Sequence, residues 1–395
     1  MATEEGGVNE TRAVITLASL TVVGYAYWNA MPLIVGGFVD EFGWSAQLAG
    51  RISSLQLFAM MTMLCVAMVT VHRWSLRTTV LCAVLLVVLS DFCAAWLESV
   101  TLMVLTRIVS GLSAGVILGA VYAAISRLGR PTRVYGIVVA SMSLSGLVWF
   151  LGIPPLLEIS GMTGPFLGFA AISLVALAMA LAWFPRFNGQ EDVASGQLDL
   201  SGILTVSVFL LAMGFFIQSV VVGANWAYWE RIGVNSGLSA QGIGVVLSLG
   251  AVSGMLGGVL AAWMDGKVGD ATALVAGLAF MGAGYAVALF YDPFAYVGAT
   301  VISYVAFSVI QTFFFGIFAK LDSSGRLVNA GNLLSFAGAA VGPAAASLVL
   351  VAGNYSPVIY AGSFGVLASL FVIMPVVMKN RRARYGTASE LGEGT

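Results

Sequence analysis

The chain has 395 residues, of which 59% are apolar and only 9% are charged, and its formal net charge is −1. An average soluble domain is about 45–50% apolar and about a quarter charged, so this composition excludes an ordinary water-soluble fold. No basic patch interleaved with aromatic residues is present, which excludes a nucleic-acid partner. The cysteines lie inside apolar runs and His72 is the single histidine. We therefore expect no disulfide framework, metal centre, catalytic triad or cofactor.

Twelve segments have the length of about 20 mostly apolar residues that a membrane-spanning helix needs. The first of them is long and is followed by no signal-cleavage site, so we expect it to be a span. The predicted spans are residues 13–37, 47–71, 77–97, 101–126, 134–157, 163–184, 200–223, 240–264, 270–290, 294–318, 327–352 and 356–378. The sequence thus predicts an all-α integral membrane protein with twelve transmembrane helices.

A polar stretch at residues 185–199 divides these spans into two groups of six and is expected to be a cytoplasmic linker. We expect one six-helix bundle over residues 13–184 and a second over 200–378, with cytoplasmic tails at 1–12 and 379–395.

The two groups also repeat in sequence. Gly43-Trp-Ser-Ala-Gln returns as Gly237-Leu-Ser-Ala-Gln, and seven positions agree at one offset of 194. Basic residues of two loops recur near the same offset: Arg73 corresponds to Lys267 in one loop, and Arg127 and Arg133 correspond to Lys320 and Arg326 in the other. This is the parallel repeat expected of two pseudo-symmetric bundles related by an axis along the membrane normal.

Basic residues set the orientation, because short cytoplasmic loops are enriched in them. With the N-terminus inside, 14 of the 17 basic residues lie on the cytoplasmic side. They are Arg12, Arg73, Arg77, Arg127, Arg130, Arg133, Arg186, Lys267, Lys320, Arg326, Lys379, Arg381, Arg382 and Arg384. Both termini are therefore predicted to be cytoplasmic.

Two motifs carry a family resemblance. The loop after the second span reads Val-Thr-Val-His72-Arg73-Trp74-Ser75-Leu76-Arg77, and its second copy reads Trp263-Met-Asp265-Gly-Lys267-Val-Gly269. The fourth span carries Arg107-Ile-Val-Ser-Gly111. In these motifs the chain resembles the major facilitator superfamily, although His72 stands where the family has an aspartate. The resemblance implies a cytoplasmic gate at Arg73, Arg77 and Asp265, and a solvated basic loop that fixes topology is the alternative.

Arg107 is the most unusual charge, because an ionisable residue inside a span is costly and is usually functional. No basic residue occupies the matching position of the second half. Asp91, on the preceding span, lies at a similar distance from the same short loop, so an ion pair is possible. Three roles stay open for Arg107: it binds an anionic substrate, it adjusts the proton affinity of an acid, or it pairs with Asp91. Gly111, Gly115 and Gly119 follow it at four-residue intervals and favour close helix packing.

Polar and aromatic residues on other spans are candidates for contact with a substrate. Their alternatives are an aromatic belt at the membrane interface for the first span and an interface anchor that contains Glu230 and Arg231 for the seventh. Gln56 on the second span and Asn332 on the eleventh are further polar residues, with a hydrogen bond between helices as the alternative. The resemblance implies that the seventh span breaks near its outer end and acts as a gate. The candidates are Tyr25 and Asn29 on the first span, Asn225, Trp226, Trp229 and Glu230 on the seventh, and Tyr304 and Gln311 on the tenth.

The resemblance implies a transporter that works by alternating access. Because no nucleotide-binding motif is present, we expect an ion or solute gradient to supply its energy, as in a secondary active transporter. Its partners would be the lipid bilayer, a small organic solute and protons, with Asp91 and Glu230 as candidate proton carriers. Arg107 beside aromatic residues favours an organic anion. The expected protein is not an enzyme; it is a monomer and a multi-pass protein of a bacterial-type inner membrane. Alternatives are a drug or metabolite efflux pump, whose usual signature is missing from the fifth span, and a non-transporting sensor.

Overall fold

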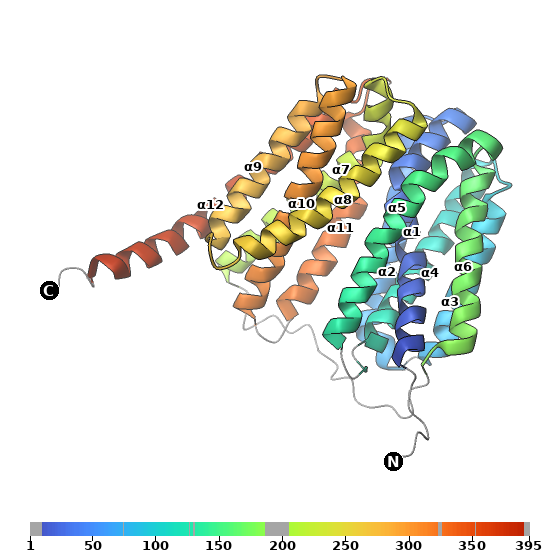
Figure 1. Ribbon diagram of the computed structural model, residues 1–395, viewed down its shortest axis with the longest axis horizontal. Helices are drawn as coiled ribbons and strands as arrows, with labels where there is room; N and C mark the ends of the chain where they lie inside the picture. Colours follow the sequence, from blue (N-terminus) through green and yellow to red (C-terminus); the bar gives the residue numbers. More distant parts are fainter. Residues whose placement is uncertain are drawn as a thin grey trace, which may run out of the picture. The chain divides into compact units, whose positions relative to one another are not determined.

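The computed structural model describes residues 10–73, 75–125, 127–128, 131–185, 205–322, 326–351 and 353–390. Twelve helices of this part are long and apolar enough to cross a membrane, which confirms the predicted number and fold class (Figure 1). They are α1 Glu10–Phe42, α2 Ala46–Thr70, α3 Leu76–Ala94, α4 Val100–Ile125, α5 Pro131–Ser160, α6 Thr163–Trp183, α7 Val206–Asn235, α8 Ala240–Met264, α9 Asp270–Ala288, α10 Pro293–Leu321, α11 Arg326–Val349 and α12 Ser356–Glu390. A short 3-10 helix, η1, covers Val71–Arg73.

Three helices run several residues past the predicted spans. Helix α7 continues beyond the apolar stretch that ends at Gly223 and reaches Asn235, with no break near that end. Helix α12 continues to Glu390, so much of the tail predicted from residue 379 is helical. The predicted N-terminal tail already becomes helical at Glu10. From Arg186 onward, the predicted linker lies outside the described residues.

The chain divides into two compact units, each with its own packing. Unit 1 comprises Met1–Gln197 together with Trp226–Val234 and Leu238–Ser248. Unit 2 comprises Leu198–Asn225, Asn235–Gly237 and Leu249–Thr395. The last turns of α7 and the first turns of α8 therefore pack with the helices of unit 1.

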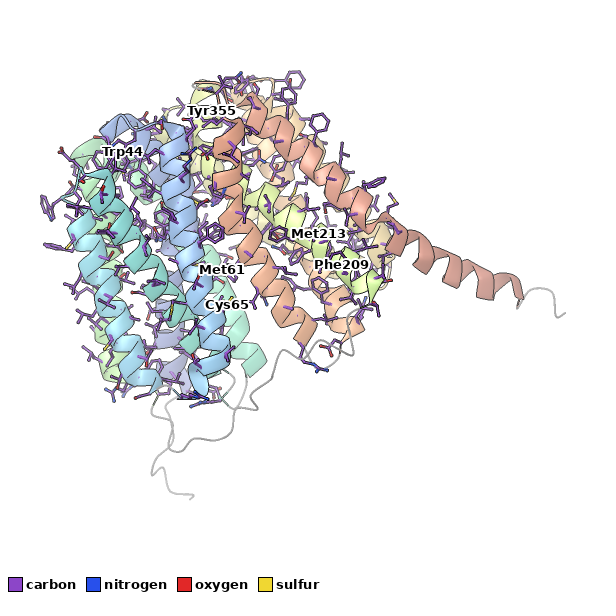
Figure 2. The ribbon with its side chains drawn as sticks, turned by 180° about the vertical axis from the view of Figure 1, so that it is seen from behind. Trp44, Met61, Cys65, Phe209, Met213 and Tyr355 are labelled. Atoms are coloured by element: carbon purple, nitrogen blue, oxygen red, sulfur yellow. The ribbon has the colours of Figure 1, made fainter. Side chains whose placement is uncertain are left out.

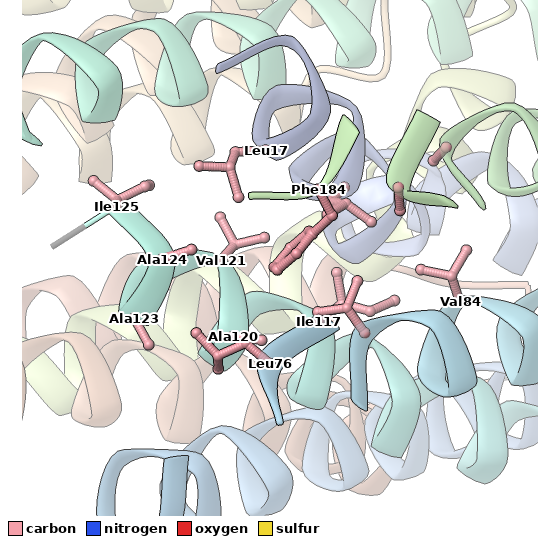
Figure 3. Packing of buried hydrophobic residues seen from close by; sticks show 14 of the residues in the cluster. Leu17, Leu76, Val84, Ile117, Ala120, Val121, Ala123, Ala124, Ile125 and Phe184 are labelled. Atoms are coloured by element: carbon pink, nitrogen blue, oxygen red, sulfur yellow. The ribbon is translucent and has the colours of Figure 1, made fainter. Parts of the chain in front are cut away.

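A core of aliphatic side chains holds unit 1 together near the start of α1 and the end of α4. Leu17, Ile117 and Val121 are fully buried there, and Phe184 packs among them (Figure 3). Other helix faces keep their apolar side chains exposed, as Phe209 and Met213 do on α7 (Figure 2). Such a distribution suits a protein whose solvent is lipid, where helices associate through close packing and not through exclusion of water.

The glycine strip of α4 packs against α2, as predicted. A side chain at Gly111 would collide with the backbone oxygen of Gln56, and one at Gly115 with that of Met60. A side chain at Gly119 would collide with Ala67. Small residues let two backbones approach closely, so the strip fixes the distance between α2 and α4.

The sequence repeat corresponds to one local structure that occurs twice. Gly43 and Gly237 both have positive φ, at 63° and 83°, which a residue with a side chain adopts only at a cost. Two residues later, the Ser45 hydroxyl accepts a hydrogen bond from Leu48 N at 3.2 Å, and the Ser239 hydroxyl accepts one from Gly242 N at 3.2 Å. Each serine thus caps the helix that follows, α2 or α8. The repeated residues are those that this turn and cap require.

Candidate functional site

An ion pair joins α3 and α4 inside unit 1. Arg107 Nη2 donates a hydrogen bond to Asp91 Oδ1 at 2.7 Å. Both residues are buried, with Arg107 0% and Asp91 3% exposed. The loop at residues 95–99 is short, so it brings the two helix ends together. Of the three roles left open for Arg107, pairing with Asp91 is the one present in this structure.

Aromatic rings surround the guanidinium of Arg107. Its Cζ lies 4.7 Å from the ring centroid of Phe166 on α6 and 5.8 Å from that of Tyr27 on α1. The Tyr27 hydroxyl is itself held at 2.9 Å from Ser53 Oγ on α2. A cation over a ring face gains about 0.5–2 kcal/mol, so these rings offset part of the cost of burying the charge.

A small cavity adjoins this pair, between α1, α2, α3, α4 and α6. It has room for about one or two water molecules, which is too little for an organic solute. Its polar lining consists of Tyr27, Gln56, Asp91, Arg107, Ser110 and Ser173. Two buried atoms of this lining, Gln56 Oε1 and Arg107 Nε, have no hydrogen-bond partner among the described residues. The cavity thus offers an unused acceptor and an unused donor beside the buried carboxylate.

A second charged group holds the end of α7 on α1, within unit 1. Arg231 donates to the Glu230 carboxylate at 2.6 and 2.7 Å, and to Asp40 at 2.6 and 2.5 Å. Glu230 and Arg231 are buried, whereas the Asp40 side chain is 61% exposed. A side chain at Gly36 of α1 would overlap the Glu230 carboxylate. We call Asp40, Glu230 and Arg231 the α7 clamp; it contains the Glu230–Arg231 pairing that the sequence offered as the alternative to a gate.

The other predicted residues of α7 are divided between the units. Trp226 Nε1 donates to the backbone oxygen of Trp28 at 2.9 Å in unit 1, and Trp229 is buried there. Asn225 belongs to unit 2, where its side chain donates to Val221 O at 3.1 Å. Trp28 also lines the cavity, so Trp226 contacts the cavity wall from outside.

Tyr25 and Asn29 of α1 take part in contacts between helices. The Tyr25 and Tyr122 hydroxyls are 2.9 Å apart, and Asn29 Nδ2 donates to Met142 O at 3.1 Å and to Ser145 Oγ at 2.9 Å. Neither Tyr25 nor Asn29 lines the cavity. Tyr27 lines it instead, and it lies on a different face of α1 from Tyr25 and Asn29, which the sequence analysis favoured.

In unit 2, the candidates of α10 face neighbouring helices. Gln311 Nε2 lies 3.5 Å from Ser335 Oγ of α11. The Tyr304 ring packs where α8 has glycines, because a side chain at Gly250 or Gly254 would touch it.

Two residues of the predicted gate, Arg77 and Asp265, make polar contacts near helix ends within their own units. Arg77 Nη2 donates to Leu181 O of α6 at 2.6 Å. Asp265 lies 3.8 Å from the Lys320 ammonium group, which also binds Asp270 at 2.9 Å. Arg73 lies exposed in η1.

Comparison with known proteins gives one consistent family. Residues 16–323 match the family described as Major Facilitator Superfamily. The "Uncharacterized MFS-type transporter YceJ" of Bacillus subtilis (strain 168) is 23% identical over 351 residues, which are 85% of this chain and 87% of that protein.

Solved transporters share the fold. The nucleoside transporter NupG is 15% identical with a TM-score of 0.73, covering 93% of this chain and 99% of that chain. A D-xylose-proton symporter is 16% identical with a TM-score of 0.73, covering 92% and 96%. An inward-facing, occupied bacterial homologue of the human lysosomal transporter Spinster is 11% identical with a TM-score of 0.71, covering 98% of each chain.

Proposed function

Because this chain belongs to the Major Facilitator Superfamily and is a transporter, not an enzyme, we propose that it couples the movement of a small uncharged organic solute to that of protons. The proposal includes secondary active transport by alternating access between two six-helix bundles, residues 13–184 and 200–378. It also includes cytoplasmic termini, a monomeric state and a location in a bacterial-type inner membrane. Arg73, Arg77 and Asp265 remain the proposed cytoplasmic gate.

The observation that carries proton coupling is the buried Asp91–Arg107 pair. Two opposite charges buried together are tolerated, whereas one of them alone is strongly destabilising. A proton that binds Asp91 removes the partner of Arg107, so it favours a conformation in which Arg107 finds another partner or water. A bound metal cation would be repelled by Arg107, whose Nη2 is 2.7 Å from Asp91 Oδ1, whereas a proton neutralises the carboxylate in place.

The same pair argues for an uncharged solute. An organic anion would need a guanidinium with unmatched charge, and the charge of Arg107 is matched by Asp91. This pairing removes the support that Arg107 alone gave to an anionic substrate. Among the structural neighbours, a nucleoside transporter and a D-xylose-proton symporter support an uncharged solute, and the symporter also supports coupling to protons.

The test is uptake of labelled D-xylose, uridine and benzoate into proteoliposomes with an imposed pH gradient. One pH unit corresponds to about 1.4 kcal/mol per proton, enough for about tenfold accumulation at one proton per solute. We expect an uncharged solute to accumulate and a protonophore to abolish the accumulation. Asp91→Asn should still exchange solute without a gradient but should lose gradient-driven accumulation.

Glu98→Gln provides the matched control, because Glu98 is exposed in the loop that joins α3 to α4. Glu230→Gln separates the two candidate proton carriers. Loss of coupling in Glu230→Gln, with coupling intact in Asp91→Asn, would move the proton site to Glu230. Accumulation that ignores the pH gradient would end the proton-coupling proposal.

A further inference from the structure

Three polar side chains converge in unit 2 from three different helices. Ser219 of α7 and Gln311 of α10 both face Ser335 of α11, with Ser219 Oγ and Gln311 Nε2 each 3.5 Å from Ser335 Oγ. We call these three residues the Ser335 cluster. Contacts of 3.5 Å lie at the long limit of hydrogen bonding, whose usual N–H···O distance is about 2.9–3.0 Å. Ser219 Oγ also donates to Phe215 O at 2.8 Å, so the capacity that the cluster leaves unused lies mainly at Gln311.

The unused capacity is largest at Gln311. Its Oε1 atom is buried and has no hydrogen-bond partner among the described residues. A buried acceptor without a partner is unfavourable, so a group that donates a hydrogen bond to it would be bound. An amide oxygen accepts from hydroxyl and N–H groups alike, which defines the polar part of a ligand.

Aromatic rings adjoin the cluster on the same helix faces. Phe215 lies four residues before Ser219, and Phe315 four residues after Gln311, so each ring is one helical turn from a cluster residue. The two rings meet edge to face with centroids 5.4 Å apart. A site for a small organic ligand usually combines an aromatic or apolar lining with a small number of polar groups.

The helix segments that build the cluster carry no charge. Residues 206–225 of α7, 293–319 of α10 and 327–349 of α11 contain no Asp, Glu, Lys or Arg. A charged ligand would lose its hydration here without gaining a counter-charge, which is costly.

The geometry points to the Ser335 cluster as a contact site for an uncharged solute that brings hydroxyl or N–H donors to Gln311 and an apolar face to Phe315. This inference rests on the proposed transport function and specifies its substrate class. If no solute binds there, the three residues only join α7, α10 and α11, as polar pairs between membrane helices do.

A test by thiol labelling does not depend on knowing the solute or on coupling. Ser335→Cys changes one atom, and it is made in the full chain with Cys65→Ala, Cys82→Ala and Cys93→Ala. The probes are three methanethiosulfonates: the uncharged methyl, the anionic sulfonatoethyl and the cationic trimethylammonioethyl reagent. Thr312→Cys is the matched control. Thr312 is exposed on α10, a membrane-spanning helix whose exposed faces meet lipid and not water, and its hydroxyl donates to its own helix, at 2.8 Å to Ser308 O.

A solute site should be hydrated in the working cycle, and a thiol reacts as its thiolate, which needs water. We expect the Ser335→Cys variant to react with the methyl reagent at least about tenfold faster than the Thr312→Cys variant does. Relative to their rates with a free thiol in water, both charged reagents should label the Ser335→Cys variant at least about tenfold more slowly than the methyl reagent.

Two outcomes overturn the inference. Labelling of the Ser335→Cys variant no faster than that of the Thr312→Cys variant means a dry contact between helices. Equal relative rates for the three reagents mean a site indifferent to charge. If Ser335→Cys fails to fold, Ser219→Cys answers the same question from α7. Since labelling needs no pH gradient, these outcomes are independent of a failure of proton coupling in the uptake assay.

Discussion

Arg107 and Asp91 lie within 2.7 Å of each other in the interior of unit 1, on two helices joined by a short loop. Their pairing was predictable because each charge is exceptional inside an apolar segment and both lie at a similar distance from one loop. Tyr27 was not predictable in the same way, because an aromatic residue on a span has many explanations. Its position against Arg107 depends on how α1 is rotated, and a single sequence does not give that rotation. Asp40 was missed because it resembles an ordinary solvated residue at a helix end.

The first residue-scale prediction concerns the stability of the ion pair. Asp91→Ala or Arg107→Ala should each lower the free energy of unfolding by about 3–5 kcal/mol, since each leaves a buried charge without its partner. The double variant should lose clearly less than the sum, because it removes both charges. Thermal unfolding of the purified protein in detergent measures this double-mutant cycle. Additive losses would mean that the two residues stabilise the fold independently.

Helix α7 shows why elements are harder to delimit than to detect. Its apolar part was readily identified, but its last turns are rich in polar and aromatic residues and resemble a loop by hydropathy. They remain helical where Arg231 binds Asp40, a residue 191 positions away in sequence. Hydropathy depends only on local sequence, so it cannot reveal such a distant partner. The glycine strip of α4 was predictable because its four-residue spacing alone places it on one helix face.

An element-scale prediction follows for the α7 clamp. Arg231→Gln should loosen residues 226–234, because Glu230 is then buried without its charged partner. Hydrogen exchange of those amides should accelerate by about tenfold or more, while exchange in α4 stays as in the parent protein. Arg51→Gln, at an exposed arginine of α2, is the control. Unchanged protection of residues 226–234 would show that the aromatic contacts alone hold this end of α7.

The contact of α2 with α4 yields a second element-scale prediction. Gly115→Leu forces a side chain into the backbone of α2 and should cost at least about 1–3 kcal/mol, with a matching loss of folded protein. Gly258→Leu on α8 should be tolerated, because nothing lies within 4 Å of the first side-chain atom it would add. Fluorescence-detected size-exclusion chromatography compares the yield of monodisperse protein. Equal yields would contradict close packing at Gly115.

For the whole molecule, the twelve crossings and the fold class follow from the lengths of the apolar segments, and the family follows from two short motifs. The solute does not follow, because substrate contacts are made by ordinary serine, glutamine and phenylalanine residues. Nothing in their local sequence distinguishes them from residues that only pack helices together. Charge, by contrast, is rare enough in a membrane to be informative wherever it occurs.

Orientation is the prediction that belongs to this scale. The distribution of basic residues places both termini in the cytoplasm, so a green fluorescent protein fused after Thr395 should fluoresce in a bacterial host. Alkaline phosphatase fused at the same position should be inactive, because it matures only outside the cytoplasm. The reverse result from the two reporters would invert the proposed topology.

Gly36 has a consequence for protein engineering. Replacing helical glycines by alanine is a common way to stabilise membrane proteins for structural work, and it gains up to about 1 kcal/mol at a permissive position. At Gly36 the added methyl group would displace the Glu230 carboxylate, so the glycine-to-alanine substitution would destabilise the protein there. Gly152 of α5 has open space where that methyl group would go and is the better target. A stabilisation campaign on this transporter should therefore choose its glycines by what lies opposite them.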